Sequence, residues 1–126
     1  MPQWKHFTLD EFACNCGVCK DNHTSHKLIT ILDIAREASG IAYVINRGYS
    51  CLAHNRTLGS KDTSCHPKGE AADIKANTPE DRFNILKGLF IAKIPRIIIY
   101  PTFIHVSINP YKPQGITYLN INGGLV

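Results

Sequence analysis

The chain is organised around one stretch, Ser64-Cys65-His66-Pro67-Lys68-Gly69-Glu70-Ala71-Ala72-Asp73-Ile74. A histidine, a glycine turn and an aspartate seven positions after the histidine can place an imidazole and a carboxylate around one divalent ion. A second histidine lies in the apolar run Phe103-Ile104-His105-Val106. Two histidines and one carboxylate, with a position left open, form the ligand set of a catalytic zinc site. We therefore expect His66, Asp73 and His105 to bind one metal ion.

The segments on the N-terminal side of this stretch carry alternating helix and strand signals. Apolar residues recur at helical spacing from Leu28 to Ala35, and Gly40 ends that helix. Residues 42–47 are rich in β-branched and aromatic side chains and are expected to form a strand. Residues 51–56 are expected to form a short helix.

The C-terminal side continues the same alternation. Residues 71–75 are expected to form a strand, and Thr78 then caps a second long helix. Residues 96–100, 102–108 and 116–119 are expected to be further strands. Because three strands have no helical crossover between them, the pattern predicts an α+β domain with a small, mostly antiparallel sheet and two long helices.

Length and composition limit the class of protein. With 126 residues, of which 44% are hydrophobic and 19% charged, we expect one globular domain over 1–126, with the cysteine-rich segment 4–24 packed on it. No apolar run approaches the ~18 residues of a membrane span. The N-terminus shows no secretory signal, so another factor would have to bring the protein to any substrate outside the cytoplasm, or the protein would act as part of a virion.

Charge and cysteine content leave alternatives open. The net charge of +4 suits an anionic polymer, but the basic residues are dispersed, which favours a solubilising surface over nucleic-acid binding. Three of the five cysteines crowd into Cys14-Asn15-Cys16-Gly17-Val18-Cys19. A second zinc site there would need a fourth ligand, such as Cys51 or His23. The favoured interpretation is a set of half-buried thiols that pack the N-terminal segment.

The central motif also resembles a known family. The string Ser64-x-His66-x-x-Gly69-x-Ala71-x-Asp73, with Phe103-Ile104-His105-Val106 after it, resembles the M15 zinc D-Ala-D-Ala carboxypeptidases and endopeptidases. It is most similar to the compact branch of that family found in bacteriophages and prophages. Asp10-Glu11-Phe12-Ala13-Cys14 resembles the Ser-Glu-Phe-x-Cys opening of that branch, and Gly48-Tyr49-Ser50-Cys51-x-x-His54-Asn55 resembles its Gly-Tyr-Arg-Cys-x-x-His-Asn segment.

The resemblance covers roughly residues 4–108 and implies the hedgehog/DD-peptidase fold with one zinc. It implies a zinc metallopeptidase that hydrolyses an amide bond in peptidoglycan stem peptides. We further expect a monomer with no nucleic-acid or membrane partner. The activity would be that of a D-Ala-D-Ala carboxypeptidase or an L-Ala-D-Glu-type endopeptidase, in phage lysis or remodelling of the cell wall. The alternative is a weakened pseudoenzyme that binds zinc and wall peptide. A cysteine-rich nucleic-acid module would leave the Ser64–Asp73 string unexplained.

Two departures from the family pattern concern the catalytic and substrate-binding groups. The family's usual acid/base, three residues before the last histidine, is replaced by Thr102, and Asp62 or Tyr100 are the candidates to stand in. For substrate binding we expect Arg47, Ser64 and Ser50. Ser50 occupies the family's arginine position. Arg47 is three residues before it, so on an extended strand the two side chains would point to opposite faces. Ser64 either contacts a substrate carboxylate or caps its loop.

Overall fold

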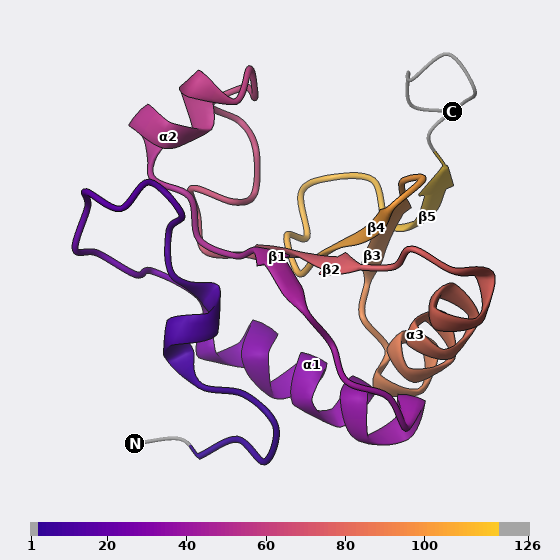
Figure 1. The fold of residues 1–126 in the computed structure, drawn as a ribbon. Helices are drawn as coiled ribbons and strands as arrows, with labels where there is room; N and C mark the ends of the chain where they lie inside the picture. Colours follow the sequence, from indigo (N-terminus) through magenta and orange to yellow (C-terminus); the bar gives the residue numbers. More distant parts are fainter. Residues whose placement is uncertain (1–2, 119–126) are drawn as a thin grey trace.

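The computed structural model describes residues 3–118 (Figure 1). Over this range a 3-10 helix η1 (Leu9–Phe12) is followed by α1 (His26–Ser39), β1 (Ile45–Arg47), α2 (Leu52–Thr57), β2 (Ala71–Lys75), α3 (Pro79–Ala92), β3 (Arg96–Ile99), β4 (Phe103–Ser107) and β5 (Gly115–Tyr118). The predicted α+β class and its two long helices, α1 and α3, are confirmed. Leu119, at the end of the expected last strand, lies outside the described residues.

The ends of the two long helices follow from local side chains. The Ser25 hydroxyl accepts the backbone N–H of Leu28 at the start of α1, and the Thr78 hydroxyl accepts that of Asp81 at the start of α3. Gly40 ends α1 in the left-handed conformation, with φ of 73°. The first strand is shorter than residues 42–47, because ladder pairing begins only at Ile45.

The five strands form one sheet in the order β1-β2-β4-β3-β5. The pairs β1–β2, β2–β4 and β3–β4 are antiparallel, whereas β3–β5 is parallel. The expectation of a mostly antiparallel sheet is therefore corrected to a mixed sheet. The reason is the connection after β4, which returns past β3 so that the N–H of Gly115 bonds to the carbonyl of Pro95 and β5 runs alongside β3.

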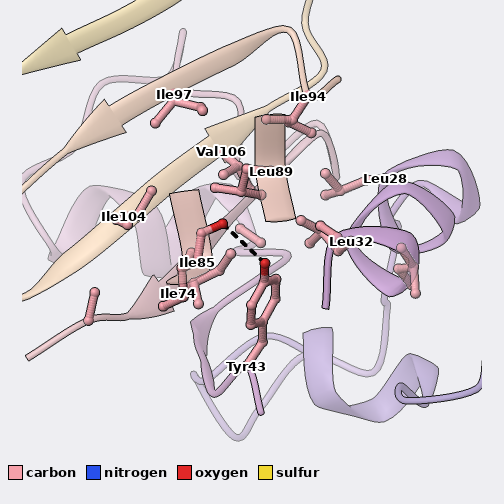
Figure 2. Close-up of a cluster of buried hydrophobic side chains, with 14 of the residues drawn as sticks. Leu28, Leu32, Tyr43, Ile74, Ile85, Leu89, Ile94, Ile97, Ile104 and Val106 are labelled. Carbon is pink, nitrogen blue, oxygen red and sulfur yellow. Dashed lines mark hydrogen bonds between the residues drawn. The ribbon is translucent and has the colours of Figure 1, made fainter. Parts of the chain in front are cut away.

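The core lies between one face of the sheet and the helices α1 and α3, which are drawn below the sheet in Figure 1. Figure 2 shows side chains from both layers meeting: Leu28, Leu32, Tyr43, Ile74, Ile85, Leu89, Ile94, Ile97, Ile104 and Val106. The Tyr43 hydroxyl donates to the carbonyl of Ile85 at 3.2 Å, so the one polar group of this cluster is satisfied. The helices approach closely at Gly88, where a Cβ would lie 2.2 Å from the carbonyl oxygen of Ala35.

The candidate functional residues lie on the face of the sheet opposite to this core. Ala72, Ile74, Ile104 and Val106 point toward the helices, so the intervening Asp73 and His105 point to the opposite face. Among the described residues, no helix is long and apolar enough to cross a membrane.

Candidate metal centre

A row of four side chains crosses the sheet on the face away from α1 and α3. The strand register pairs Arg47 with Asp73, Asp73 with His105, and His105 with Ile98. Directly opposed residues on neighbouring strands have side chains within contact distance. The sheet itself therefore brings the Asp73 carboxylate and the His105 imidazole together and fixes both on rigid backbone.

The third residue, His66, reaches this row from the loop before β2. Gly69 turns that loop with φ of 71°, in the left-handed region, and packs so tightly on the chain before α1 that a Cβ would lie 1.8 Å from the carbonyl oxygen of His23. The N–H of Gly69 bonds to the carbonyl of His66, and the N–H of Ser25 bonds to the carbonyl of Gly69. Gly69 therefore anchors the loop to the start of α1 and holds His66 in place.

Two imidazole nitrogens converge on one carboxylate oxygen. The Nε2 of His66 lies 3.3 Å from Oδ1 of Asp73, and the Nδ1 of His105 lies 2.8 Å from the same oxygen. Nδ1 of His66 lies 2.8 Å from the carbonyl of Gly48. A carbonyl can only accept, so this contact places the proton on Nδ1 and leaves the lone pair on Nε2. The three candidate ligand atoms lie within 4.8 Å of one another, and all three residues are buried.

Burial and contact shift the pKa values of Asp73 and His105. Burial acts to raise the pKa of Asp73, but the hydrogen bonds and charges of His105 and His66 outweigh it and hold that pKa below its usual range. Burial lowers the pKa of His105, against the opposing effect of Asp73. Both shifts favour the deprotonated forms, a carboxylate and a neutral imidazole, which are the forms that bind metal.

The three residues lie in the wall of an open cleft of about 720 Å³. Its lining comes from the loop before β2, from the strands β1 to β4 and from the chain after β4. Its lining comprises Arg47, Gly59, Ser60, Lys61, Thr63, Ser64, Cys65, His66, Asp73, Arg96, Ile98, Tyr100, Phe103, His105 and Lys112. A molecule of peptide size can therefore reach the His66, Asp73 and His105 side chains from one side.

A bulge explains why Arg47 lies on this face. Ile45 pairs with Ile74 but Arg47 pairs with Asp73, so the register shifts between the two residues. An extra residue in one strand switches the side chains beyond it to the other face. Arg47 therefore lines the cleft while Ile45 packs against the core.

The residues around Arg47 hold its guanidinium in place. Its Nη2 donates to the Asn55 side chain and lies 3.4 Å from the Ser50 hydroxyl. The predicted substrate-binding residue Ser50 is thus fully buried and touches Arg47 without lining the cleft. Asn55 also donates to the carbonyl of Lys61 and so braces the loop beside the site. Within residues 3–118, Nε of Arg47 is buried and has no hydrogen-bond partner.

Of the other predicted residues, two line the cleft and two lie outside it. Ser64 lines the cleft, and its hydroxyl accepts the N–H of His66 at 3.3 Å, so this side chain shapes its own loop. Thr102 is exposed in the turn between β3 and β4 and does not line the cleft. Asp62 also points elsewhere, since both its carboxylate oxygens bond to Arg56, at 3.0 and 2.7 Å. Tyr100 is the one candidate for proton transfer that lines the cleft.

Sequence patterns missed three cationic residues of the cleft: Arg96, Lys61 and Lys112. The position of Arg96 could have been predicted, because strand alternation with the buried Ile97 places it on the same face of β3 as Ile98. Lys61 and Lys112 lie in loops, where no periodicity predicts direction. Asp73 is the single carboxylate among the cleft-lining residues that the structure describes.

The chain belongs to the Peptidase M15 family, because the model of that family matches residues 5–107. The matched range contains all three candidate ligands, and M15 peptidases are in general zinc-dependent. Membership indicates a metallopeptidase that acts on peptidoglycan. A search of curated proteins found no matching relative.

Proposed function

We propose that the protein is a zinc-dependent peptidase that cleaves an amide bond in peptidoglycan stem peptides. The observation that carries this proposal is the convergence of His66, Asp73 and His105 in the wall of an open cleft, in a chain of the M15 family. The scissile bond would be that of a D-Ala-D-Ala carboxypeptidase or an L-Ala-D-Glu-type endopeptidase.

The donor set fits one zinc ion. Nitrogen from two neutral imidazoles and oxygen from a carboxylate are ordinary zinc ligands, and three protein ligands are typical of catalytic sites. The contact of His66 with Gly48 supplies the outer partner that orients a ligating histidine. Zinc bound by these residues would polarise a scissile carbonyl and lower the pKa of the attacking water.

The walls of the cleft suit an acidic peptide. Four cationic side chains line it, Arg47, Lys61, Arg96 and Lys112, against the single carboxylate of Asp73. Arg47 is the side chain best placed to bind a substrate carboxylate or carbonyl, because it lines the cleft beside Asp73 and its Nη2 is braced by Asn55.

The described cleft lining contains no carboxylate besides the candidate ligand Asp73 that could transfer a proton. Burial raises the pKa of the Tyr100 phenol, and the charge of Asp73 adds to this, so Tyr100 keeps its proton and can donate a hydrogen bond to a substrate oxygen in the cleft. It cannot replace a carboxylate base at neutral pH. The lack of a second carboxylate in the described cleft lining supports the alternative of a weakened enzyme that binds zinc and wall peptide with slow turnover.

Further features belong to the same proposal. The order β1-β2-β4-β3-β5 with two helices on one face is consistent with the hedgehog/DD-peptidase fold. We propose a single M15-like domain that acts as a monomer on the bacterial wall, as a phage or prophage lysis protein delivered by another factor. Nucleic acid and membrane are not proposed as partners.

The test is digestion of purified wall sacculi by the zinc-loaded protein, with mass spectrometry of the released fragments. We expect fragments that differ by hydrolysis of one stem-peptide amide, and no such fragments from His66→Ala or from chelator-treated protein. His26→Ala is the matched control, because His26 is exposed on α1, outside the cleft. Wall binding by the zinc-loaded protein without any cleavage would favour the pseudoenzyme.

A further inference from the structure

Three cysteines that are close in sequence meet a fourth that is distant in sequence. Cys14, Cys16 and Cys19 follow η1, and Cys51 is the N-cap of α2. Their sulfur atoms all lie within 4.8 Å of one another, and each residue is half-buried. All four are free thiols. None of them lines the cleft, so this cluster is separate from the His66, Asp73 and His105 site.

Backbone N–H groups point at three of the four sulfurs. Cys16 Sγ accepts from Val18 and Cys19, at 3.3 and 3.2 Å. Cys14 Sγ accepts from the N–H of Cys51 at 3.4 Å, and Cys51 Sγ accepts from that of His54 at 3.5 Å. Hydrogen bonds from the surrounding backbone stabilise thiolates and orient them as metal ligands.

We propose that Cys14, Cys16, Cys19 and Cys51 hold a structural zinc ion. Four thiolates at Zn–S distances of about 2.3 Å form a tetrahedron whose sulfurs are about 3.8 Å apart. The sulfurs here already lie within 4.8 Å of one another, with Cys16 and Cys19 at 3.4 Å. A four-thiolate set with no open position is the ligand set of a structural zinc.

The geometry also separates this assignment from its competitors. A disulfide joins two sulfurs about 2.05 Å apart. A Cys16–Cys19 disulfide would therefore not explain why the sulfurs of Cys14 and Cys51 lie at the same point. His23, the other candidate fourth ligand, instead packs its ring against Tyr49 at 5.2 Å. Cys65 is buried apart from the cluster, in the cleft lining.

The cluster lies where a metal would stabilise the catalytic architecture. Besides the bond from Cys51 to Cys14, two hydrogen bonds join the N-terminal segment to the chain around β1, from Asn15 to the carbonyl of Asn46 and from the N–H of Tyr49 to the carbonyl of Phe12. Between these contacts lies Gly48, whose carbonyl orients His66. Zinc shared by both segments would clamp them together and so hold Gly48 in place.

The experiment is elemental analysis of the full chain purified without chelator, combined with cobalt substitution. We expect two zinc ions per chain in the wild type, and one in both Cys19→Ser and His66→Ala. Cys65→Ser, the matched control, should keep two. Cobalt-loaded His66→Ala should show thiolate-to-cobalt charge-transfer absorption, which cobalt-loaded Cys19→Ser should lack.

If Cys19→Ser does not fold, the wild type and His66→Ala decide the question. Titration with a mercurial reagent should release one zinc as four thiols react, while the second zinc stays bound. The proposal is overturned if the wild type holds one zinc that His66→Ala removes, if iron replaces zinc, or if thiol counts in denaturant and chelator fall short by two or four. Loss of zinc in His66→Ala but not in Cys19→Ser would instead leave the peptidase proposal intact, so the two can fail separately.

Discussion

The tightest backbone contact of the metal-site loop gives a quantitative prediction for Gly69→Ala. A residue with a side chain at φ of 71° costs roughly 1–2 kcal/mol. The new Cβ would also lie 1.8 Å from the His23 carbonyl oxygen, and such overpacking costs about 1–3 kcal/mol more. The sum is a loss of ~2–5 kcal/mol in the free energy of unfolding, or ~8–20 °C in Tm for a domain of this size.

The control is Gly40→Ala, because Gly40 has φ of 73° but no atom within 4 Å of an added Cβ. It should lose only the conformational part, ~4–8 °C in Tm. Differential scanning calorimetry of both variants measures the difference. Gly69→Ala should also weaken the zinc binding that we propose for His66, Asp73 and His105, since the N–H of Gly69 is bonded to the carbonyl of His66. Equal Tm shifts in the two variants would refute the tight packing of this loop.

Three further predictions concern charge in and around the cleft. In metal-stripped protein, burial places the folded-state pKa of His105 below its unfolded value of 6.5. The free energy of unfolding should therefore decrease as pH falls through 6.5, by at most ~1.4 kcal/mol per pH unit. A urea unfolding midpoint that stays constant between pH 7.5 and 5 would contradict this. Arg47→Ala should lower kcat/KM on a stem peptide by ~10–100-fold with zinc content unchanged, as expected for a lost charged hydrogen bond, whereas Arg56→Ala, outside the cleft, should have little effect. Thr102→Glu should raise turnover if the missing carboxylate limits the rate, because its turn carries the cleft-lining Phe103; unchanged turnover would rule out that position for the base.

Much of the fold follows from local sequence patterns. Gly40 ends α1 and Thr78 caps α3 where capping chemistry predicts, and the strands that carry Asp73 and His105 lie within the expected ranges, β2 at Ala71–Lys75 and β4 at Phe103–Ser107. These features depend on residues within a few positions of each other. Local pattern is therefore sufficient to predict them.

Features set by pairing between distant segments could not be predicted in the same way. The bulge that turns Arg47 into the cleft arises from the register of β1 on β2, which no local pattern of residues 45–47 encodes. The choice of Cys51 over His23 as the fourth member of the cysteine cluster depends on how the segment after η1 meets the start of α2, where the N–H of Cys51 bonds to Cys14 Sγ. The parallel pairing of β5 likewise depends on the path of the connection after β4.

The most direct measurement of the metal centre is an anomalous difference map from crystals of the zinc-loaded protein, collected at the zinc edge. We predict a peak bonded to His66, Asp73 and His105 at about 2.0–2.2 Å, with its remaining coordination position open to the cleft. A second peak should lie among the four cysteine sulfurs. A map with no peak at the three residues, or with a peak that contacts only one of them, would contradict the assignment of this site as the catalytic metal centre.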